Sequence, residues 1–585
     1  EIVGRFQGKE SRVKLEVSDF ADSRPVQFIA EVEPILAKKG CNSGGCHGKA
    51  SGQNGFRLSL LGYDPEFDYQ TIVREGRGRR VFPAAPEQSL ILRKATSIAP
   101  HGGGRRIEPD SAESRILERW IRQGMPRPSR EEPQLVALHV EPARRVVSRQ
   151  SIQQLRVTAR FSDGTAQDVT RLTQLQSNDP SLATVDETTA QVQTLDRVGD
   201  VAIMARFGGL IDVARIAVPN ERPSIAWEIP PSNNLIDPYV FGKLKELGLP
   251  PSESCTDAEF ARRSSLDLCG VLPTPEEVAA LESDRRPDKR ERWIDQLLDR
   301  PAHADFFALK WASILRVKRA QNAATPASSF AFHAWIRQAL ASNMPYDEFA
   351  TRIIAARGDV SQNPAVVWYR QIRTPEDQVD NTAQLFLGLR LQCARCHHHP
   401  FEKWGQDDYY GLASFFTRVG RKPGEDPQTP SIYTLPETRF ATNPTTQSSR
   451  PPKLLGAEEL PKLGPFDDPR DQLASWLRQE DNPYFAKALV NRYWKHFFGV
   501  GLVDPEDDFR ASNPPSNPEL LDALAKDFAT HGYDLKRLTR ILATSRAYER
   551  SANPRGENAA DRRNFARFSV RRLPAEVLLD GINTV

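Results

Sequence analysis

The sequence predicts a multidomain protein that is mainly α-helical and contains one all-β domain. Three observations support this prediction. The chain has 585 residues, which is too long for one compact core and corresponds to about four domains. Apolar residues recur at helical spacing near residue 115 and throughout the second half of the chain. Between residues 134 and 220, apolar and polar residues alternate instead, as in half-buried strands.

Composition excludes several classes of protein. The 79 Lys and Arg residues nearly balance the 76 Asp and Glu residues, which gives no support for a nucleic-acid binder. No apolar run approaches the ~18 residues of a transmembrane helix. Six cysteines are too few for a disulfide scaffold. The chain starts at Glu1 and ends within a helical pattern, so we expect a trimmed N-terminus and a parent chain that continues past Val585.

The first two predicted domains differ in their periodicity. Residues 21–132 form the first domain, which closes with a helix over residues 111–123, where Ile116, Leu117, Trp120 and Ile121 share one face. Residues 134–220 form the second. Leu155, Val157, Ala159 and Phe161 alternate with polar residues, and so do Val201, Ile203, Ala205 and Phe207. Several short strands at this spacing predict a β-sandwich.

The remaining chain is predicted to be helical in two stretches. Residues 223–420 carry helical periodicity over 276–282, 290–298, 306–317 and 330–342. Residues 421–470 hold ten prolines and predict a linker or an irregular surface segment. Residues 471–585 are helical again, with apolar stripes at Phe485, Leu489, Tyr493 and Phe497 and at Leu520, Leu521, Leu524 and Phe528.

The strongest chemical motif is Cys393-Ala-Arg-Cys396-His397. Two thiols separated by two residues can form thioethers to the vinyl groups of one haem, and the adjacent His then lies under the iron as its proximal ligand. The alternatives are a zinc or redox Cys-x-x-Cys site, in which His397 and His399 would complete the ligands, or a disulfide or free thiols.

A second motif, Cys41-Asn-Ser-Gly-Gly-Cys46-His47, has four intervening residues. As in the first motif, the second cysteine is followed directly by a histidine. Gly44 and Gly45 let the two extra residues loop out. On spacing alone, a haem attachment site and a loop disulfide are both open.

The chain resembles the planctomycete-type multidomain cytochrome c proteins. Residues 36–126 resemble their cytochrome C domain, notably in CNSGGCHGKASGQNGFRLSLLGYDPEFDY, GRGRRVFPAAPEQSLILRKAT and PHGGGRRIEP. Residues 134–220 resemble a bacterial Ig-like domain of group 2, in RFSDGTAQDVT and SNDPSLATVD. Residues 230–420 and 483–585 resemble two associated helical domains of unknown function, in LGLRLQCARCHHHPFEKWGQDDYYGLASFF and NRYWKHFFGVGLVDPEDDF.

The resemblance implies an exported, periplasmic or extracellular protein with two covalent haem c groups that acts in electron transfer, alone or within an oxidoreductase. Its implied partner is a redox donor or acceptor protein, with a homo-oligomer or surface complex as a further option. Three other functions stay open: a haem enzyme with an open iron site that acts on a small molecule or glycan, a structural protein that carries haems, and a non-haem metal enzyme using Cys393, Cys396, His397 and His399.

Candidate second ligands of the two irons come from different parts of the chain. For the first haem, His101 in a glycine-rich segment is favoured over Met125, and absence of a protein ligand is the third option. The basic residues Arg74, Arg77, Arg79 and Arg80 can pair with haem propionates or form a solvated face. For the second haem, His398 and His399 follow His397 too closely to reach the opposite side of the iron, although His399 fits the family motif. More distant candidates are His303, His333, His496, His531 and Met344.

Two cysteines remain once both motifs are assigned to haem. Cys255 and Cys269 are 14 residues apart, and we expect either a disulfide between them, which suits an oxidising compartment, or two separate buried thiols.

Overall fold

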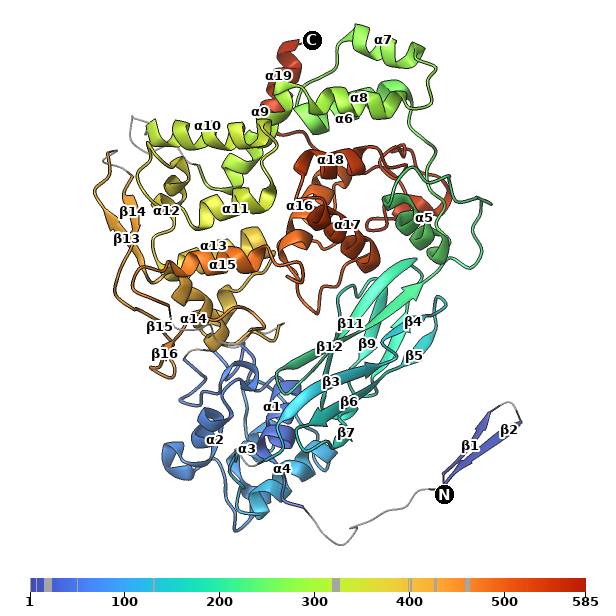
Figure 1. Ribbon diagram of the computed structural model, residues 1–585. Helices are drawn as coiled ribbons and strands as arrows, with labels where there is room; N and C mark the ends of the chain where they lie inside the picture. Colours follow the sequence, from blue (N-terminus) through green and yellow to red (C-terminus); the bar gives the residue numbers. More distant parts are fainter. Residues whose placement is uncertain are drawn as a thin grey trace. The chain divides into compact units, whose positions relative to one another are not determined.

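The computed structural model describes residues 2–6, 8–14, 24–49, 51–129, 132–317, 327–397, 399, 402–425, 429–457 and 463–584. The chain divides into two compact units (Figure 1). The first comprises Glu1–Ala137 with Arg160–Gln167, and the second comprises Leu138–Ala159 with Asp168–Val585. None of the helices in these described ranges has the length and apolar content needed to cross a membrane.

The first unit is a small helical body preceded by a hairpin. Its helices are α1 (Glu33–Lys38), α2 (Pro65–Val73), α3 (Leu90–Ala95) and α4 (Ala112–Arg122), and strands β1 (Ile2–Phe6) and β2 (Lys9–Val13) pair antiparallel. The helix predicted over 111–123 is α4. The Ser111 hydroxyl caps its first turn, and Trp120 packs against Phe28 with ring centroids 5.4 Å apart. A single aromatic core therefore holds the two ends of this unit together.

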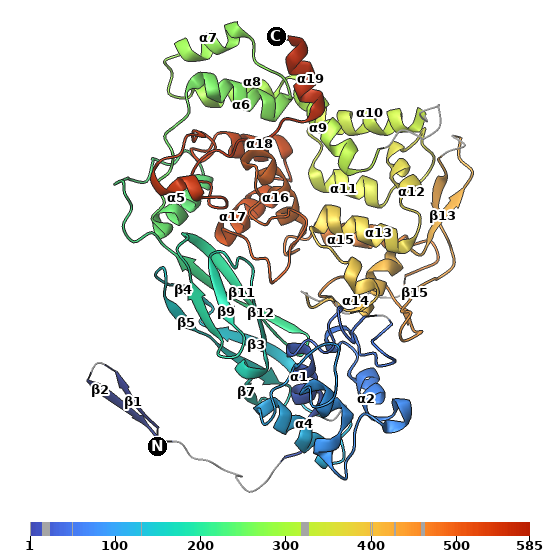
Figure 2. The same ribbon diagram turned by 180° about the vertical axis from the view of Figure 1, so that it is seen from behind.

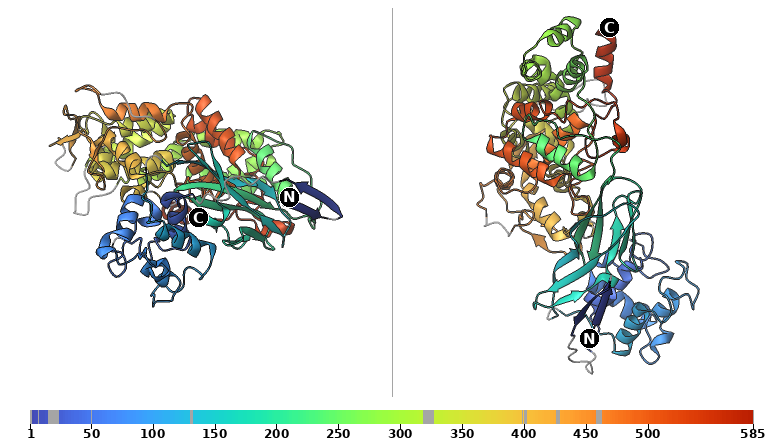
Figure 3. Two further views of the ribbon diagram at one scale, coloured as in Figure 1. Left: turned by 90° about the horizontal axis from the view of Figure 1, so that it is seen from below. Right: turned by 90° about the vertical axis from the view of Figure 1, so that its right-hand side faces the viewer.

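The predicted β region contains ten strands in three sheets. The sheet orders are β5-β10-β9, β4-β12-β11-β8 and β3-β6-β7. The alternation at residues 155–161 is confirmed in β6, where Val157, Ala159 and Phe161 are buried. The antiparallel pair β11–β12 has the longest register of this region. Figure 3 shows the strands of the region in cyan to green. The strands are β3 (Leu135–Glu141), β4 (Arg144–Val146), β5 (Ile152–Gln154), β6 (Arg156–Phe161), β7 (Ala166–Asp168), β8 (Gln174–Ser177), β9 (Ala183–Asp186), β10 (Gln191–Thr194), β11 (Gly199–Phe207) and β12 (Leu210–Val218).

The rest of the second unit is helical, as the periodicity predicts. Every helical stretch named from the sequence coincides with a helix, shifted by a few residues at its ends. The helices are α5 (Ile236–Leu247), α6 (Asp257–Cys269), α7 (Pro275–Ser283), α8 (Lys289–Leu298), α9 (Pro301–Ile314), α10 (Ala327–Ala341), α11 (Tyr346–Ile354), α12 (Trp368–Gln371), α13 (Pro375–Thr382), α14 (Gln406–Ala413), α15 (Pro469–Leu477), α16 (Phe485–Phe498), α17 (Pro518–Thr530), α18 (Leu535–Ala543) and α19 (Ala575–Thr584).

The two helical segments expected as separate domains share one hydrophobic core. Buried residues from Ala217 to Val577 form one continuous cluster. Helix α17 lies beside α5 in Figures 1 and 2, and the Asn517 amide donates to the Tyr239 carbonyl at 3.0 Å. Tyr346 of α11 stacks on Phe485 of α16 with ring centroids 4.9 Å apart. The proline-rich stretch therefore does not separate two cores.

That proline-rich stretch, predicted as a linker or surface segment, is folded against the helices. It contains two short hairpins, formed by β13 (Val419–Lys422) with β14 (Ser431–Thr434) and by β15 (Ala441–Thr442) with β16 (Ser449–Arg450). The Ser414 hydroxyl donates to the Arg450 carbonyl and accepts from the Ala441 N–H. The proline-rich stretch is therefore a surface segment that contains paired strands and buries apolar side chains such as that of Ile432.

The expected disulfide between Cys255 and Cys269 is absent, because helix α6 holds the two residues apart. Both are buried free thiols. The helix runs from Asp257 to Cys269, which spans about 18 Å at 1.5 Å per residue. A disulfide needs Cα atoms within about 7 Å. The second alternative, two separate buried thiols, is the one that the structure contains.

Candidate functional site

The loop with the first Cys-His motif turns tightly after α1. The Cys41 N–H donates to the Leu36 carbonyl at 2.8 Å, which ties the loop to the end of the helix. The His47 N–H donates to the Cys41 carbonyl at 3.0 Å, so the four intervening residues loop out as expected. A Cβ atom at Gly48 would lie 2.0 Å from the Asn42 carbonyl oxygen, which explains why glycine follows the histidine.

His47 and His101 come together although 54 positions separate them. Their ring centroids are 6.3 Å apart, and their planes differ by 7°. Nδ1 of His47 donates to the Phe56 carbonyl at 2.9 Å, and Nδ1 of His101 donates to the Gly104 carbonyl at 2.8 Å. A carbonyl can only accept, so Nδ1 donates in both rings, and in the neutral form of the ring Nε2 then keeps its lone pair. Burial lowers the pKa of His47, which favours this neutral form.

The two rings are stacked, and their separation equals the one expected of two histidines that hold one metal ion between them. A metal–imidazole bond is about 2 Å long and the ring centre lies about 1.2 Å further back, so opposed rings have centres about 6.3 Å apart. The observed separation is the same. Backbone acceptors at the remote nitrogen are the usual way in which proteins orient metal-binding histidines.

A cavity of about 590 Å³ surrounds these residues. Cys41, Cys46, His47 and His101 all line it, together with apolar side chains such as Phe56 and Leu90. Its charged lining residues are Arg79, Arg80, Lys94 and Arg106, with no carboxylate among the described ones. A haem has an apolar face, two vinyl groups and two propionates, so the thiols, the apolar wall and the four cations fit its parts.

The cations around this cavity are held in different ways. Arg80 is buried and donates to the carbonyls of Thr71, Glu75 and Gly55, so it is fixed in place. Arg79 and Arg106 are exposed. Of the predicted basic run, Arg79 and Arg80 line the cavity, whereas Arg74 and Arg77 are not among the lining residues. Sequence inspection missed Lys94 and Arg106, which come from separate segments.

Cys41 and Cys46 are free, half-buried thiols. Burial raises the pKa of Cys41 to about 12, so its sulfur is protonated at neutral pH. The structure thus contains no loop disulfide.

Met125, the alternative to His101 as a ligand, does not line the cavity. Its N–H donates to the Trp120 carbonyl at the end of α4, and its own carbonyl accepts from the Tyr69 hydroxyl at 2.9 Å.

A buried acid pair adjoins the loop and was not predicted. Oδ1 and Oδ2 of Asp68 accept from the Ser59 N–H and hydroxyl, and Asn42 donates to Glu33 at 3.4 Å. Burial and the nearby Asp68 raise the pKa of Glu33 well above its usual range, and burial raises that of Asp68 to about 6. Burial thus favours the protonated form of these two acids next to the Cys41–His47 loop.

The second Cys-His motif lies on a short 3₁₀ turn at the surface of the second unit. Cys393 and Cys396 are exposed and His397 is half-buried, whereas His398 lies outside the described residues. His399 is buried, and its Nε2 donates to the Arg390 carbonyl at 3.1 Å. In the part of the chain that the structure describes, no three His, Cys, Asp or Glu side chains gather as a metal-binding group. The two thiols are accessible to solvent.

The more distant histidines have other partners. Nδ1 of His303 donates to the Leu268 carbonyl and Nε2 of His496 donates to the Asp267 carbonyl, both at the C-terminal end of α6. Burial lowers the pKa of His303 to about 4 and that of His496 well below its usual value. His531 pairs with Asp527 at 3.3 Å. These interactions stabilise helix packing.

Two protein-family models match the helical part of the chain. Residues 235–421 match PSCyt2, described as Protein of unknown function (DUF1549), and residues 469–585 match PSD1, described as Protein of unknown function (DUF1553). These are the two helical planctomycete domains expected from the sequence. Neither match reaches the first 234 residues, so the cytochrome and Ig-like resemblances rest on their motifs alone. No curated protein matches the chain.

Proposed function

We propose that the protein is an exported cytochrome that carries covalent haem c and transfers electrons. The observation that supports this most strongly is the pair of parallel imidazoles, His47 and His101, across a cavity that also exposes Cys41 and Cys46. In this proposal, Cys41 and Cys46 anchor the porphyrin, and His47 and His101 hold its iron. The haem, when bound, supplies one-electron chemistry.

The residues around the cavity have defined tasks in this proposal. The Phe56 and Gly104 carbonyls orient the two imidazoles and fix their tautomers. Arg79, Arg80, Lys94 and Arg106 neutralise the propionates. With His47 and His101 both holding the iron, the haem would supply electron transfer rather than a site for a substrate at the iron.

A second haem at Cys393, Cys396 and His397 is part of the proposal, and it is supported by the motif and by the exposure of both thiols. The Ig-like assignment of residues 134–220 is supported by the antiparallel pairing of β8, β11 and β12. The periplasmic or extracellular location follows from covalent haem attachment and from the family resemblance.

The proposal is tested by haem content after export in a host that matures c-type cytochromes. We expect intact mass and a pyridine haemochrome spectrum to show two haems per chain. The double variant Cys41→Ala/Cys46→Ala and the double variant Cys393→Ala/Cys396→Ala should each lose one. Cys255→Ala/Cys269→Ala is the matched control and should keep both. A chain without covalent haem overturns the proposal, and a single haem lost only with Cys41 and Cys46 restricts it to the first unit.

A further inference from the structure

A separate cavity of about 790 Å³ lies within the second unit. Three chain segments form it: residues 226–231, residues 251–254 and residues 546–555, which follow α18. Its lining includes apolar side chains, those of Trp227, Pro230, Pro231 and Pro251, and charged ones, those of Glu228, Glu253, Arg546, Arg550 and Arg555. Ligand sites in proteins commonly have this size and this combination of an apolar wall with a few charged groups.

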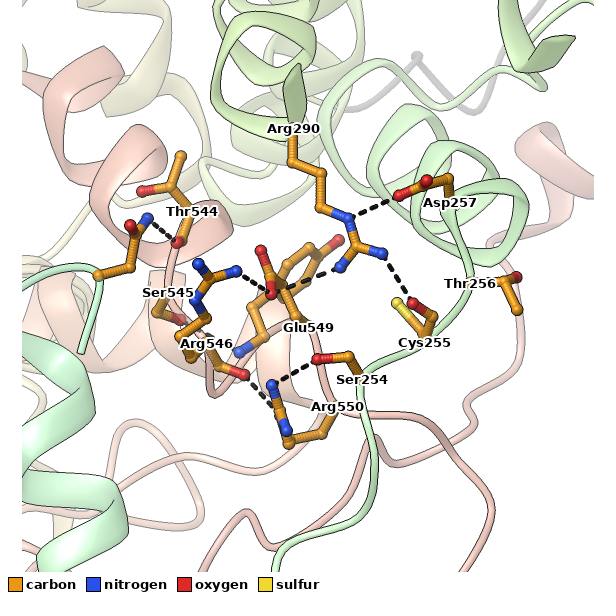
Figure 4. A network of polar contacts seen from close by, with 12 residues as sticks. Ser254, Cys255, Thr256, Asp257, Arg290, Thr544, Ser545, Arg546, Glu549 and Arg550 are labelled. Atoms are coloured by element: carbon orange, nitrogen blue, oxygen red, sulfur yellow. Dashed lines mark hydrogen bonds and ion pairs between the residues drawn. The ribbon is translucent and has the colours of Figure 1, made fainter. Parts of the chain in front are cut away.

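Arg550 carries a buried charge without a carboxylate partner. Its side chain is only 5% exposed. Nε donates to the Arg546 carbonyl at 2.8 Å and Nη2 to the Ser254 hydroxyl at 2.8 Å (Figure 4). Nη1 donates to the Ser252 carbonyl at 3.1 Å. All three acceptors are neutral, and no described carboxylate lies within ion-pairing distance of this guanidinium. Burial accordingly lowers the pKa of Arg550.

The neighbouring carboxylates are already shared among other cations. Oε2 of the buried Glu549 lies 2.8 Å from Arg546 and 3.4 Å from Arg290 (Figure 4). Asp257 lies 2.9 Å from Arg290 and 2.5 Å from Lys289. The cavity is also lined by Glu228, Glu253 and Arg555, and Glu253 pairs with Arg555 at 2.9 Å. Its three arginines therefore exceed its two glutamates by one charge. A partly buried excess of positive charge is costly, and an anion in the cavity would offset it.

The apolar part of the cavity lining favours a ligand that contains a ring. The Lys245 ammonium lies 5.4 Å from the centre of the Trp227 ring, which helps to fix the indole. Together with three prolines, this indole offers a rigid apolar surface with little conformational entropy to lose on binding.

We propose that this cavity binds a carboxylate carried on a ring, with the acid group at Arg546 and Arg550 and the ring against Trp227. The planar guanidinium fork matches a carboxylate, and Arg546 has one nitrogen engaged with Glu549 while the others face no described acceptor. This site is independent of haem, so it goes beyond electron transfer. A sugar acid and an aromatic acid share the required chemistry.

Calorimetric titration of the purified full chain tests the proposal, with glucuronate and benzoate as the two acids. Glucose and benzyl alcohol are their neutral counterparts. We expect at least one acid to bind about tenfold more tightly than its neutral counterpart, because charge-assisted hydrogen bonds are lost with the carboxylate. Binding of glucuronate alone identifies a sugar acid, and binding of benzoate alone identifies an aromatic acid. If neither acid binds more tightly than its counterpart, the proposal is wrong.

Three variants locate the binding. Arg546→Gln and Trp227→Ala should each weaken binding of the acid about tenfold. Glu228→Gln removes a like charge from the exposed rim and should tighten binding about threefold. Arg478→Gln, at the exposed end of α15, is the matched control and should bind as the parent does. Thermal unfolding verifies that each variant is folded. Because Glu228→Gln acts in the opposite direction, misfolding cannot imitate its effect. Equal affinities across the four variants would contradict the proposed location.

Discussion

At the scale of single residues, backbone carbonyls decide what each histidine can do. In the first unit, Phe56 and Gly104 accept from Nδ1, so Nε2 of His47 and His101 stays available. In the second unit, Arg390 accepts from Nε2 of His399 instead. His399 fits a family motif as well as His101 does. The two histidines differ in which ring nitrogen donates to a backbone carbonyl, and the motif does not specify that.

Substitution of His101 provides the first prediction at this scale. In the haem-loaded protein, His101→Ala should remove one of the two histidines that would hold the iron, since His101 lines the cavity parallel to His47. We expect the absorption spectrum to change from low-spin to high-spin and the reduced form to bind carbon monoxide. Met125→Ala is the control and should leave the spectrum unchanged, because Met125 does not line the cavity. The opposite pattern would identify Met125 as the ligand.

The second residue-scale prediction concerns His303, whose burial lowers its pKa from 6.5 to about 4. Below pH 6.5 the unfolded chain takes up a proton at this position while the folded chain does not, so acid favours unfolding. The contribution of His303 to stability should fall by about 1.4 kcal/mol per pH unit between pH 6.5 and about 4, and be constant above pH 6.5. The free energy of unfolding can be measured by denaturant unfolding at several pH values. Plotted against pH below 6.5, it should change less steeply for His303→Gln than for the parent. Parallel curves would contradict this assignment.

At the scale of elements, the periodicity of apolar residues predicted the helices and strands reliably. The spacing of residues along the sequence did not predict which distant side chains meet. The stripe Phe485, Leu489, Tyr493 and Phe497 is buried in α16, and the alternation around Val157 is buried in β6, because each pattern is set by local geometry. Lys94 and Arg106 reach the same cavity from separate segments, and no local pattern reports that. Cys255 and Cys269 are 14 residues apart in the sequence, and the helix between them keeps them too far apart for a disulfide.

Helix α6 gives the element-scale prediction. Because the helix separates Cys255 from Cys269, both should react as thiols in unfolded protein that has never been reduced. Alkylation in denaturant followed by intact mass measurement should show these two sites modified, with prior reduction adding no further sites there. Cys269→Ala should remove one of them. A shift that appears only after reduction would instead indicate the disulfide.

At the scale of the whole molecule, family boundaries and folding units do not coincide. The PSCyt2 and PSD1 matches are separated by 47 residues of the proline-rich stretch, from 422 to 468. Nevertheless, Tyr346 in the first segment stacks on Phe485 in the second, and Phe307 stacks on Tyr493 with ring centroids 5.5 Å apart. Each segment therefore buries apolar surface that the other would leave exposed.

The last prediction follows from this shared core. Phe485 is fully buried, so Phe485→Ala should lower the free energy of unfolding by about 3–5 kcal/mol. Hydrogen exchange followed by mass spectrometry should show amides in both segments losing protection together, because one core holds them. Phe466 is 92% exposed, so Phe466→Ala is the matched control and should change stability by less than about 0.5 kcal/mol. If amides in residues 235–421 kept their protection while those in residues 469–585 lost it, the two segments would fold independently.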